Sequence, residues 1–187
     1  IDTNNNDVSI AGTVGSVGGL TKSGAGTLTI TGVTTVGRDL TISAGTFVAP
    51  TSLTINGDFT NNGTYTHSDG MVTFVPLTPS LTSSILGNSN TTFYNFTNTT
   101  AGSTLKFKAG NTYTFNNLLT LTGTDEQRIY IDSDTGSGQW YMNLVGSSSV
   151  NYLNVKNSGC AGGNNIPYND TLTNLGNNGL CWFYISY

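Results

Sequence analysis

One phrase recurs along the chain: Thr27-Leu28-Thr29-Ile30, then Asp39-Leu40-Thr41-Ile42-Ser43, then Ser52-Leu53-Thr54-Ile55-Asn56. In each copy two apolar residues flank a Thr, and the leucines lie 12 and 13 residues apart. A second marker, Gly-Thr followed by an apolar residue, begins at Gly26, Gly45 and Gly63, at intervals of 19 and 18 residues. Alternating apolar and polar residues predict short strands. Self-similarity at a fixed period predicts a solenoid, in which strand-rich coils stack on one another.

The composition supports an all-β fold. Only 9% of the 187 residues are charged, against about a quarter in an average protein. Long surface helices need strong helix formers and charged outer faces, so this composition excludes them. Thr and aromatic residues favour strands, whereas Gly and Asn suit the corners between strands. Apolar residues recur at strand spacing throughout, which argues against disorder.

Residues 26–65 carry the most regular pattern. Thr and Ser point to solvent there, and the apolar residues point inward and stack on those of the next coil. The predicted inward residues are Leu28, Ile30, Leu40, Ile42, Phe47, Leu53, Ile55, Phe59 and Tyr65.

The pattern loosens after residue 72. Pro76 and Pro79 cannot donate to a strand ladder, so residues 75–90 are predicted to form a protruding loop or a broad corner. Strands are expected again at 93–96, 105–107, 113–115, 119–121, 129–131, 140–144 and 150–155. At about 19 to 25 residues and ~4.8 Å per coil, the chain makes roughly seven or eight coils and a rod of ~35–40 Å.

The chain is predicted to be one domain, residues 1–187, in three parts. Residues 1–25 form an irregular first coil or cap, 26–155 form the coils, and 156–187 form a closing coil clipped by a disulfide. Cys160 and Cys181 lie in one Gly/Asn-rich segment, which favours a disulfide in an oxidising compartment. The alternative is two reduced thiols, one buried beside Trp182. A zinc site is not expected, because there is no third Cys and the single His67 is remote in sequence.

Charge and hydropathy exclude two classes of partner. The net charge is −4 and the six Lys and Arg residues are scattered, so nucleic-acid binding is not expected. No apolar run approaches the roughly 18 residues of a membrane span. The chain begins at Ile1 without Met. We interpret this beginning as the product of a cleaved secretion signal, in preference to a cut fragment.

The repeated phrases resemble a known group of proteins. Gly26-Thr27-Leu28-Thr29-Ile30-Thr31-Gly32 and Leu53-Thr54-Ile55-Asn56-Gly57-Asp58-Phe59 are similar to coils of bacterial secreted right-handed parallel β-helix proteins. These include autotransporter passenger domains and filamentous-haemagglutinin-like adhesins. The end, Asn177-Asn178-Gly179-Leu180-Cys181-Trp182-Phe183, is similar to their closing coil. The resemblance covers residues 26–187. It implies a single-domain right-handed parallel β-helix at a cell surface and brings no catalytic residues with it. Such proteins are usually very long, whereas this chain is short.

Two clusters are candidates for chemistry. Asp132 and Asp134, in Asp132-Ser133-Asp134-Thr135-Gly136-Ser137-Gly138, could offer oxygen ligands to Ca²⁺, but the third acidic position and the distal Glu of a Ca²⁺ loop are missing. The alternative is a polar corner in which Asp bonds to backbone. Asp125-Glu126-Gln127-Arg128 could hold a carboxylate pair for glycosidic cleavage or an Arg for a uronate.

Neither cluster predicts an enzyme. No spacing forces the basic residues Arg38, Lys106, Lys108, Arg128 and Lys156 to converge on the two aspartates. His67 lies in a polar turn beside Ser68 and Asp69 without a nucleophile motif. We therefore expect no catalytic centre, no metal and no cofactor.

Two surface patterns suggest further roles. The Thr-x-Thr pairs at Thr27/Thr29, Thr64/Thr66, Thr112/Thr114 and Thr120/Thr122 would resemble an ice-binding face if they stacked on one flat side. Asp39, Ser52 and Asn56 interrupt them, and Thr is also an ordinary strand residue. Asn-x-Ser/Thr sequons at Asn62, Asn90, Asn95, Asn98 and Asn169 are candidate glycosylation sites.

The predicted function is structural or adhesive. We expect a secreted subunit of a self-assembling surface fibre, or an adhesin segment, that associates with copies of itself head to tail through the solenoid ends. The residues predicted at that interface are Val8, Ile10, Trp182, Phe183, Tyr184, Ile185 and Tyr187. Self-capping by the aromatic end is the alternative. A carbohydrate-binding or carbohydrate-cleaving β-helix, with surface glycans as partners, and an ice-binding solenoid are the other two functional hypotheses.

Overall fold

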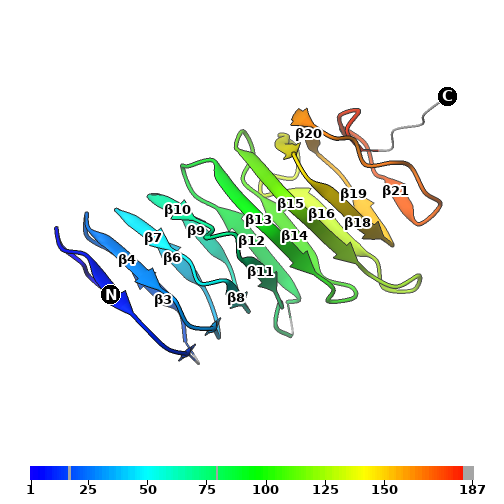
Figure 1. Ribbon diagram of the computed structural model, residues 1–187. Helices are drawn as coiled ribbons and strands as arrows, with labels where there is room; N and C mark the ends of the chain where they lie inside the picture. Colours follow the sequence, from blue (N-terminus) through cyan, green and yellow to red (C-terminus); the bar gives the residue numbers. More distant parts are fainter. Residues whose placement is uncertain (17, 79, 183–187) are drawn as a thin grey trace.

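The chain winds into a parallel β-solenoid whose coils lie side by side from one end of the molecule to the other (Figure 1). The computed structural model describes residues 1–16, 18–78 and 80–182. Within these ranges the ordered elements are strands, and no helix is present. The all-β solenoid predicted from the repeated phrase is confirmed.

Each of the first four coils has three short strands. These are β1 (Val8–Ile10), β2 (Val14–Ser16), β3 (Leu20–Lys22), β4 (Thr27–Ile30), β5 (Thr34–Val36), β6 (Leu40–Ile42), β7 (Thr46–Val48), β8 (Ser52–Ile55), β9 (Phe59–Asn61), β10 (Thr64–Thr66), β11 (Met71–Phe74) and β12 (Thr82–Leu86). Several later strands are longer: β13 (Thr91–Asn98), β14 (Thr104–Phe107), β15 (Thr112–Thr122), β16 (Ile129–Ser133), β17 (Trp140–Leu144), β18 (Ser147–Asn151), β19 (Leu153–Val155), β20 (Ser158–Gly163) and β21 (Leu172–Asn174).

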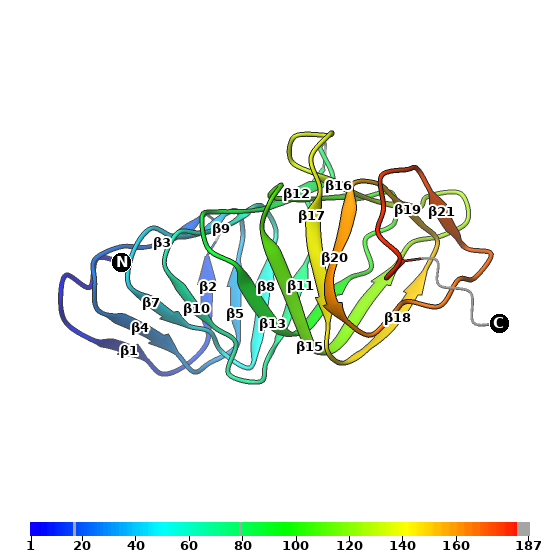
Figure 2. The same cartoon turned by 90° about the horizontal axis from the view of Figure 1, so that it is seen from above.

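Three sheets build the walls of the solenoid. Sheet 1 has the order β1-β4-β7-β10. Sheet 2 has β2-β5-β8-β11-β13-β15-β17-β20, with β18 beside β15, and sheet 3 runs from β3 through β6, β9, β12, β14, β16 and β19 to β21. Figure 2 separates them, with β3, β9, β12 and β16 along one side and β1, β4 and β7 along the other. Sheet 3 is 8-stranded, one strand per coil. This count agrees with the predicted seven or eight coils.

The core is a stack of inward side chains in which aromatic rings are concentrated in the middle coils, with mainly aliphatic residues toward both ends. All the predicted inward residues from Leu28 to Phe59 are buried, and Tyr65 is half-buried. Further along, Phe93 and Phe115 stack with ring centroids 6.1 Å apart, and Phe107 and Trp140 stack at 4.1 Å. Parallel in-register pairing puts like side chains one above another, so each coil buries the face of its neighbour.

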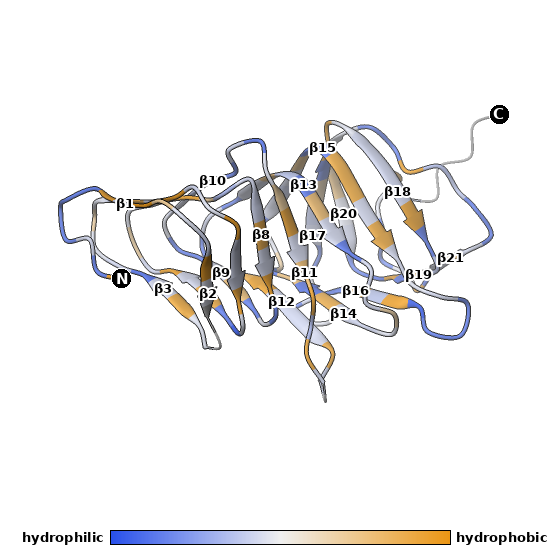
Figure 3. Ribbon diagram, turned by 60° about the horizontal axis from the view of Figure 1, so that its bottom comes forward, coloured by the Kyte–Doolittle hydropathy of each residue, from blue (hydrophilic) through white to orange (hydrophobic). Residues whose placement is uncertain are grey.

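The structure corrects four predicted boundaries. The loop predicted at 75–90 is shorter, because β12 occupies its second half; the remaining loop projects from the body in Figure 3. The strands predicted at 113–115 and 119–121 form one strand, β15. The strand predicted at 150–155 is divided into β18 and β19 by Tyr152, whose φ of 55° makes a corner. The first coil is more regular than residues 1–25 suggest, since β1, β2 and β3 all pair in register with the second coil.

Candidate functional site

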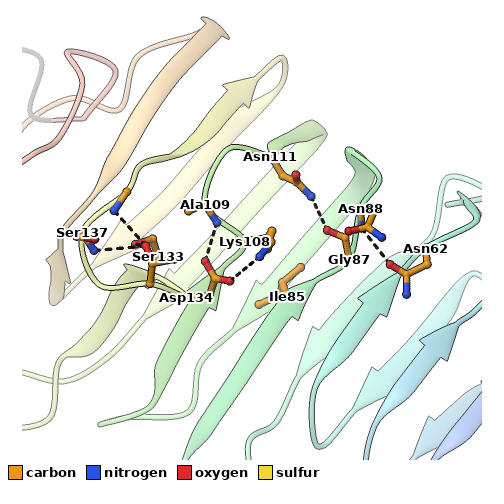
Figure 4. Close-up of polar contacts among 12 residues, drawn as sticks. Asn62, Ile85, Gly87, Asn88, Lys108, Ala109, Asn111, Ser133, Asp134 and Ser137 are labelled. Carbon is orange, nitrogen blue, oxygen red and sulfur yellow. Dashed lines mark hydrogen bonds and ion pairs between the residues drawn. The ribbon is translucent and has the colours of Figure 1, made fainter.

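Asp and Asn side chains at the corners accept backbone hydrogen bonds from the neighbouring coil. Asp39 Oδ1 accepts from Asp58 N at 2.8 Å, and Asp58 Oδ1 accepts from Ser84 N at 2.7 Å. Figure 4 shows the same arrangement at Asn62, whose Oδ1 accepts from Asn88 N at 3.0 Å. Further pairs are Asp7 with Thr27, Asn90 with Thr112 and Asn178 with Ser158. These side chains satisfy backbone donors where the strand ladders are interrupted.

The Asp132–Asp134 segment is built as a polar corner. Asp134 accepts from Lys108 Nζ at 3.2 Å and from Ala109 N at 2.8 Å (Figure 4). Asp132 Oδ1 accepts from Asn157 Nδ2 and Ser133 N, both at 2.7 Å. The two carboxylates therefore bond to protein groups of different coils. In the part of the chain that the structure describes, no group of three or more His, Cys, Asp or Glu residues could hold a metal ion.

Arg128 ties its loop to the last coil. Its guanidinium donates to Thr171 O at 2.6 Å and to Thr173 Oγ1 and Asp125 Oδ1, both at 3.3 Å. It also lies over the Tyr152 ring, 5.8 Å from the centroid. The predicted cluster Asp125-Glu126-Gln127-Arg128 is thus one loop on sheet 3, with its only cation already engaged.

A groove of about 360 Å³ opens beside this loop. We call it the Tyr130 groove. Its lining residues are Leu81, Ala101, Gly102, Asp125, Glu126, Gln127, Arg128, Tyr130 and Asn154. Tyr130 and Asn154 are paired neighbours on β16 and β19 and line it from the outer face of sheet 3.

A second groove of about 360 Å³ lies beside the projecting loop. Arg38, Asp39 and Asp58 are its charged residues. One oxygen of each carboxylate is already used in a corner hydrogen bond. The carboxylates of this groove therefore belong to the series of corner hydrogen bonds between neighbouring coils, which we call the corner ladder, and their role is mainly structural.

His67 lies apart from both grooves. Its Nδ1 accepts from Asp69 N at 3.0 Å, its Nε2 is 3.4 Å from Asn116 Nδ2, and its ring stacks on Tyr94 with centroids 5.5 Å apart. The structure does not bring His67, Glu126 and the two aspartates of 132–134 into one site: His67 follows β10, Glu126 is between β15 and β16, and the aspartates are at the end of β16.

The C-terminal end is closed by the chain itself. Cys160 and Cys181 form the predicted disulfide, with Cα atoms 5.7 Å apart. Trp182 is only 2% exposed, and its Nε1 donates to Ser158 Oγ at 2.6 Å. The prediction of Trp182 as an interface residue is therefore wrong, because its indole fills the last coil of its own chain. Phe183, Tyr184, Ile185 and Tyr187 lie outside the described residues.

The N-terminal end is only partly covered. Val8 and Ile10, predicted at the interface, are half-buried, as are Val14 and Leu20. Residues 1–3 run beside the end of β3, where Thr3 N donates to Ser23 O at 3.0 Å. Lys22 is fully buried in this first coil, and its Nζ donates to Ser23 O, Gly24 O and Ala44 O at 2.6 to 2.9 Å.

A ladder of threonines runs along sheet 2. Thr35, Thr54, Thr73, Thr97 and Thr120 are successive register partners on five neighbouring strands. The Thr-x-Thr pairs chosen from the sequence are not on one face, because Thr27 and Thr64 belong to sheet 1 and Thr120 to sheet 2. The column beside the ladder is mixed: Ser52, Met71, Asn95 and Leu118.

The sequons differ in accessibility. Asn98 is fully buried, and its Nδ2 is enclosed in the core, so its prediction as a glycosylation site is wrong for the folded chain. Asn62 and Asn90 are exposed, and Asn95 and Asn169 are half-buried. Each of these four uses its Oδ1 in a hydrogen bond.

Three features were not predicted from the sequence: buried Lys22, the pairing of Tyr130 with Asn154, and the register of the Thr ladder. Lys22 follows Leu20 at the spacing of an inward residue, which is the one local signal that marked it. The other two depend on coil lengths.

Comparison of the chain with models of protein families, with curated proteins and with solved structures gives no match. No helix in the described residues is long and apolar enough to cross a membrane.

Proposed function

We propose that the chain is a non-catalytic structural element of an extracellular assembly, a fibre subunit or adhesin segment that associates head to tail through its solenoid ends. The observation that supports it is the incompletely covered N-terminal coil. Val8 and Ile10 are half-buried, whereas their register partners Leu28 and Ile30 in the second coil are at most 1% exposed. The apolar side chains of the first coil thus lack the cover that the second coil receives.

The free edges of the sheets provide the matching backbone. Within the described residues, β1 pairs only with β4 and β2 only with β5, and at the other end β18, β20 and β21 each have one neighbour. Unpaired strand edges are templates for pairing with another chain. Because the two ends are different surfaces, contact between copies is heterologous and propagates as a filament. The role of Trp182 is to hold the last coil rigid from inside.

An oxidising compartment is supported by the disulfide, since cytosolic thiols are kept reduced. The corner bonds of Asp132 and Asp134 give these carboxylates a structural role, so a catalytic role is not needed to account for them.

Sedimentation velocity tests the association. The unmodified protein should form concentration-dependent oligomers at high micromolar concentration. Ile10→Lys should abolish them, because it places a charge among the apolar side chains of the first coil. Ser9→Lys is the matched control, because Ser9 lies on the same strand but points outward. A monomeric unmodified protein, or equal loss of association in both variants, would overturn the proposal.

Single replacements of His67, Glu126, Asp132 and Asp134 by Ala test the non-catalytic role. Assembly should persist in all four, with a stability cost of about 1–2 kcal/mol only at the two aspartates that lose corner bonds. Cleavage of an acidic polysaccharide by the unmodified protein that is lost in one of these variants would contradict this part of the proposal.

Ice binding is a second candidate, favoured by the ladder from Thr35 to Thr120. Strands in one sheet are about 4.8 Å apart, so the ladder places hydroxyl and methyl groups at a regular interval. Thermal hysteresis measured on the unmodified protein should then be lost in Thr73→Lys, at the middle of the ladder. Thr41→Lys on sheet 3 is the control. Absence of thermal hysteresis, or its persistence in Thr73→Lys, eliminates this candidate.

A further inference from the structure

Asn154 is a largely buried residue whose side-chain amide has no protein partner within the described residues. Its side chain is on the outward side of β19, the residue is 8% exposed, and within the described residues its amide makes no hydrogen bond. Its amide oxygen and nitrogen are not among the fully enclosed polar atoms that lack a partner, so they remain accessible from the groove. Asn154 lines the Tyr130 groove. The amide is therefore available to a molecule that enters there.

Tyr130 supplies a flat aromatic surface beside this amide. It is the register partner of Asn154 on the adjacent strand and is 48% exposed, so its ring is accessible from the groove. Adjacent strands are about 4.8 Å apart, so the ring and the amide can contact one small ligand together. A few polar groups beside an aromatic surface are typical of ligand sites.

The walls of the groove are held in place. Gly102 N donates to Gln127 O at 3.0 Å, which joins the 101–102 turn to the 125–128 loop. Arg128 fastens the same loop to Thr171 and Thr173. The site is thus preformed, which lowers the entropy cost of binding. Its volume of about 360 Å³ lies within the range of small-molecule pockets, about 300–1,000 Å³.

We propose that the Tyr130 groove binds a pyranose ring of a neutral glycan. The apolar C–H face of the sugar would stack on Tyr130, and vicinal hydroxyls would donate to and accept from the Asn154 amide. The Glu126 carboxylate, exposed on the wall, would accept a hydrogen bond from a further hydroxyl group. A uronate is disfavoured, because Asp125 and Glu126 repel it and Arg128 is already paired with Asp125. This inference deepens the adhesin part of the proposed function and rests on it for the extracellular setting.

The experiment is binding of the purified protein to an array of neutral, amino-sugar and uronate oligosaccharides, followed by calorimetric titration with the best neutral glycan. The affinity should fall about tenfold or more in Tyr130→Ala and in Asn154→Leu. Tyr168→Ala is the matched control, because Tyr168 is 49% exposed and does not line the groove. No binding to any neutral glycan, or unchanged affinity in both groove variants, overturns the proposal.

Two readouts distinguish glycan binding by Asn154 from a structural role of its amide and from head-to-tail association. Asn154→Leu should leave the melting temperature unchanged, because the amide makes no hydrogen bond that the substitution would remove. A clear fall would show that Asn154 has a structural partner and would contradict the proposal. Ile10→Lys should retain glycan affinity, so failure of head-to-tail association and failure of the glycan site are distinguished.

Discussion

Tyr65 and Tyr113 both bury a hydroxyl group, but the surroundings of the two hydroxyls differ. Tyr113 Oη donates to Ile85 O at 2.7 Å and accepts from Lys108 N at 3.2 Å. Tyr65 Oη is enclosed among aromatic rings and has no partner in the described residues. Burial raises the pKa of both phenols well above the ordinary value, because it penalises the charged form.

Replacing each tyrosine by Phe should have opposite effects on the free energy of unfolding. Tyr65→Phe removes an unpaired polar atom and should stabilise the protein by up to about 1 kcal/mol. Tyr113→Phe removes two hydrogen bonds but leaves Lys108 N bonded to Ile85 O at 3.0 Å, so it should destabilise the protein by about 0.5–1.5 kcal/mol. Denaturant unfolding measures both, and a loss of stability in Tyr65→Phe would show that its hydroxyl is satisfied.

The raised pKa values also predict sensitivity to alkali. Stability should be constant in this respect below the ordinary Tyr pKa of about 10 and should decline above it, because the unfolded chain releases these protons first. Unfolding curves measured from about pH 8 to about pH 11.5 should show a smaller decline in Tyr65→Phe than in the unmodified protein. An identical pH dependence in the two proteins would contradict a raised Tyr65 pKa.

The corner ladder predicts a difference between two neighbouring asparagines. Asn62 accepts from the backbone of the next coil, whereas only the backbone N of Asn88 takes part in this bond. Asn62→Ala should cost about 0.5–1.5 kcal/mol of unfolding free energy, and Asn88→Ala should remain within about 0.5 kcal/mol. Equal effects in thermal unfolding would mean that the corner bond contributes nothing.

At the scale of the element, β3 contains a charged residue in a core column. Lys22 pairs with Ile42, which pairs with Asn61, so its side chain is directed inward with them. Three backbone carbonyls surround the ammonium group, which matches its three donors. The first coil is therefore held to the second by the corner as well as by the strand ladder.

Lys22→Met should loosen the first coil without unfolding the rest. Coils contact only their neighbours, so a defect at one end remains local. Amide hydrogen exchange should accelerate in β1 and β3, with a cost of about 1–3 kcal/mol, while β8 and β11 remain protected. Lys106→Met, on the outer face of β14, should leave exchange unchanged. Unaltered protection of β3 in Lys22→Met would show that the three carbonyls bonded to Lys22 do not stabilise the first coil.

At the scale of the molecule, the two ends are finished differently. The disulfide, Trp182 and Ile166 close the C-terminal end, while the N-terminal end shows half-buried Val8 and Ile10. The two ends of the solenoid therefore differ in how they are stabilised as well as in chain direction. One end is stabilised covalently, and the other gains most from a further coil.

Replacement of Cys160 and Cys181 by Ser should lower the stability of the last coils by about 3 kcal/mol in the chain-entropy model. The loop spans a sequence separation of 21 residues. Hydrogen exchange should rise in β20 and β21 and remain slow in β4 to β8. A uniform rise along the chain would show that the solenoid unfolds as one cooperative unit.

The sequence by itself determined the solenoid, the inward residues from Leu28 to Phe59 and the disulfide. These depend on short-range alternation and a nearly constant period, which act within one coil and its neighbour. Where the period is regular, the local sequence pattern is therefore sufficient to predict which residues contact each other in neighbouring coils.

Only the tertiary structure decided which residues of distant coils lie together. Successive residues of the Thr ladder are 19, 19, 24 and 23 positions apart, so no fixed period reveals it. The Tyr130 groove combines residues of four successive coils in the same way, and Trp182 is buried against Ser158, 24 positions earlier in the chain. Corners absorb insertions at little cost, while strand register is set by packing of the whole stack. Which residues of different coils lie side by side therefore depends on the lengths of all the corners between them. No single segment of the sequence gives this information.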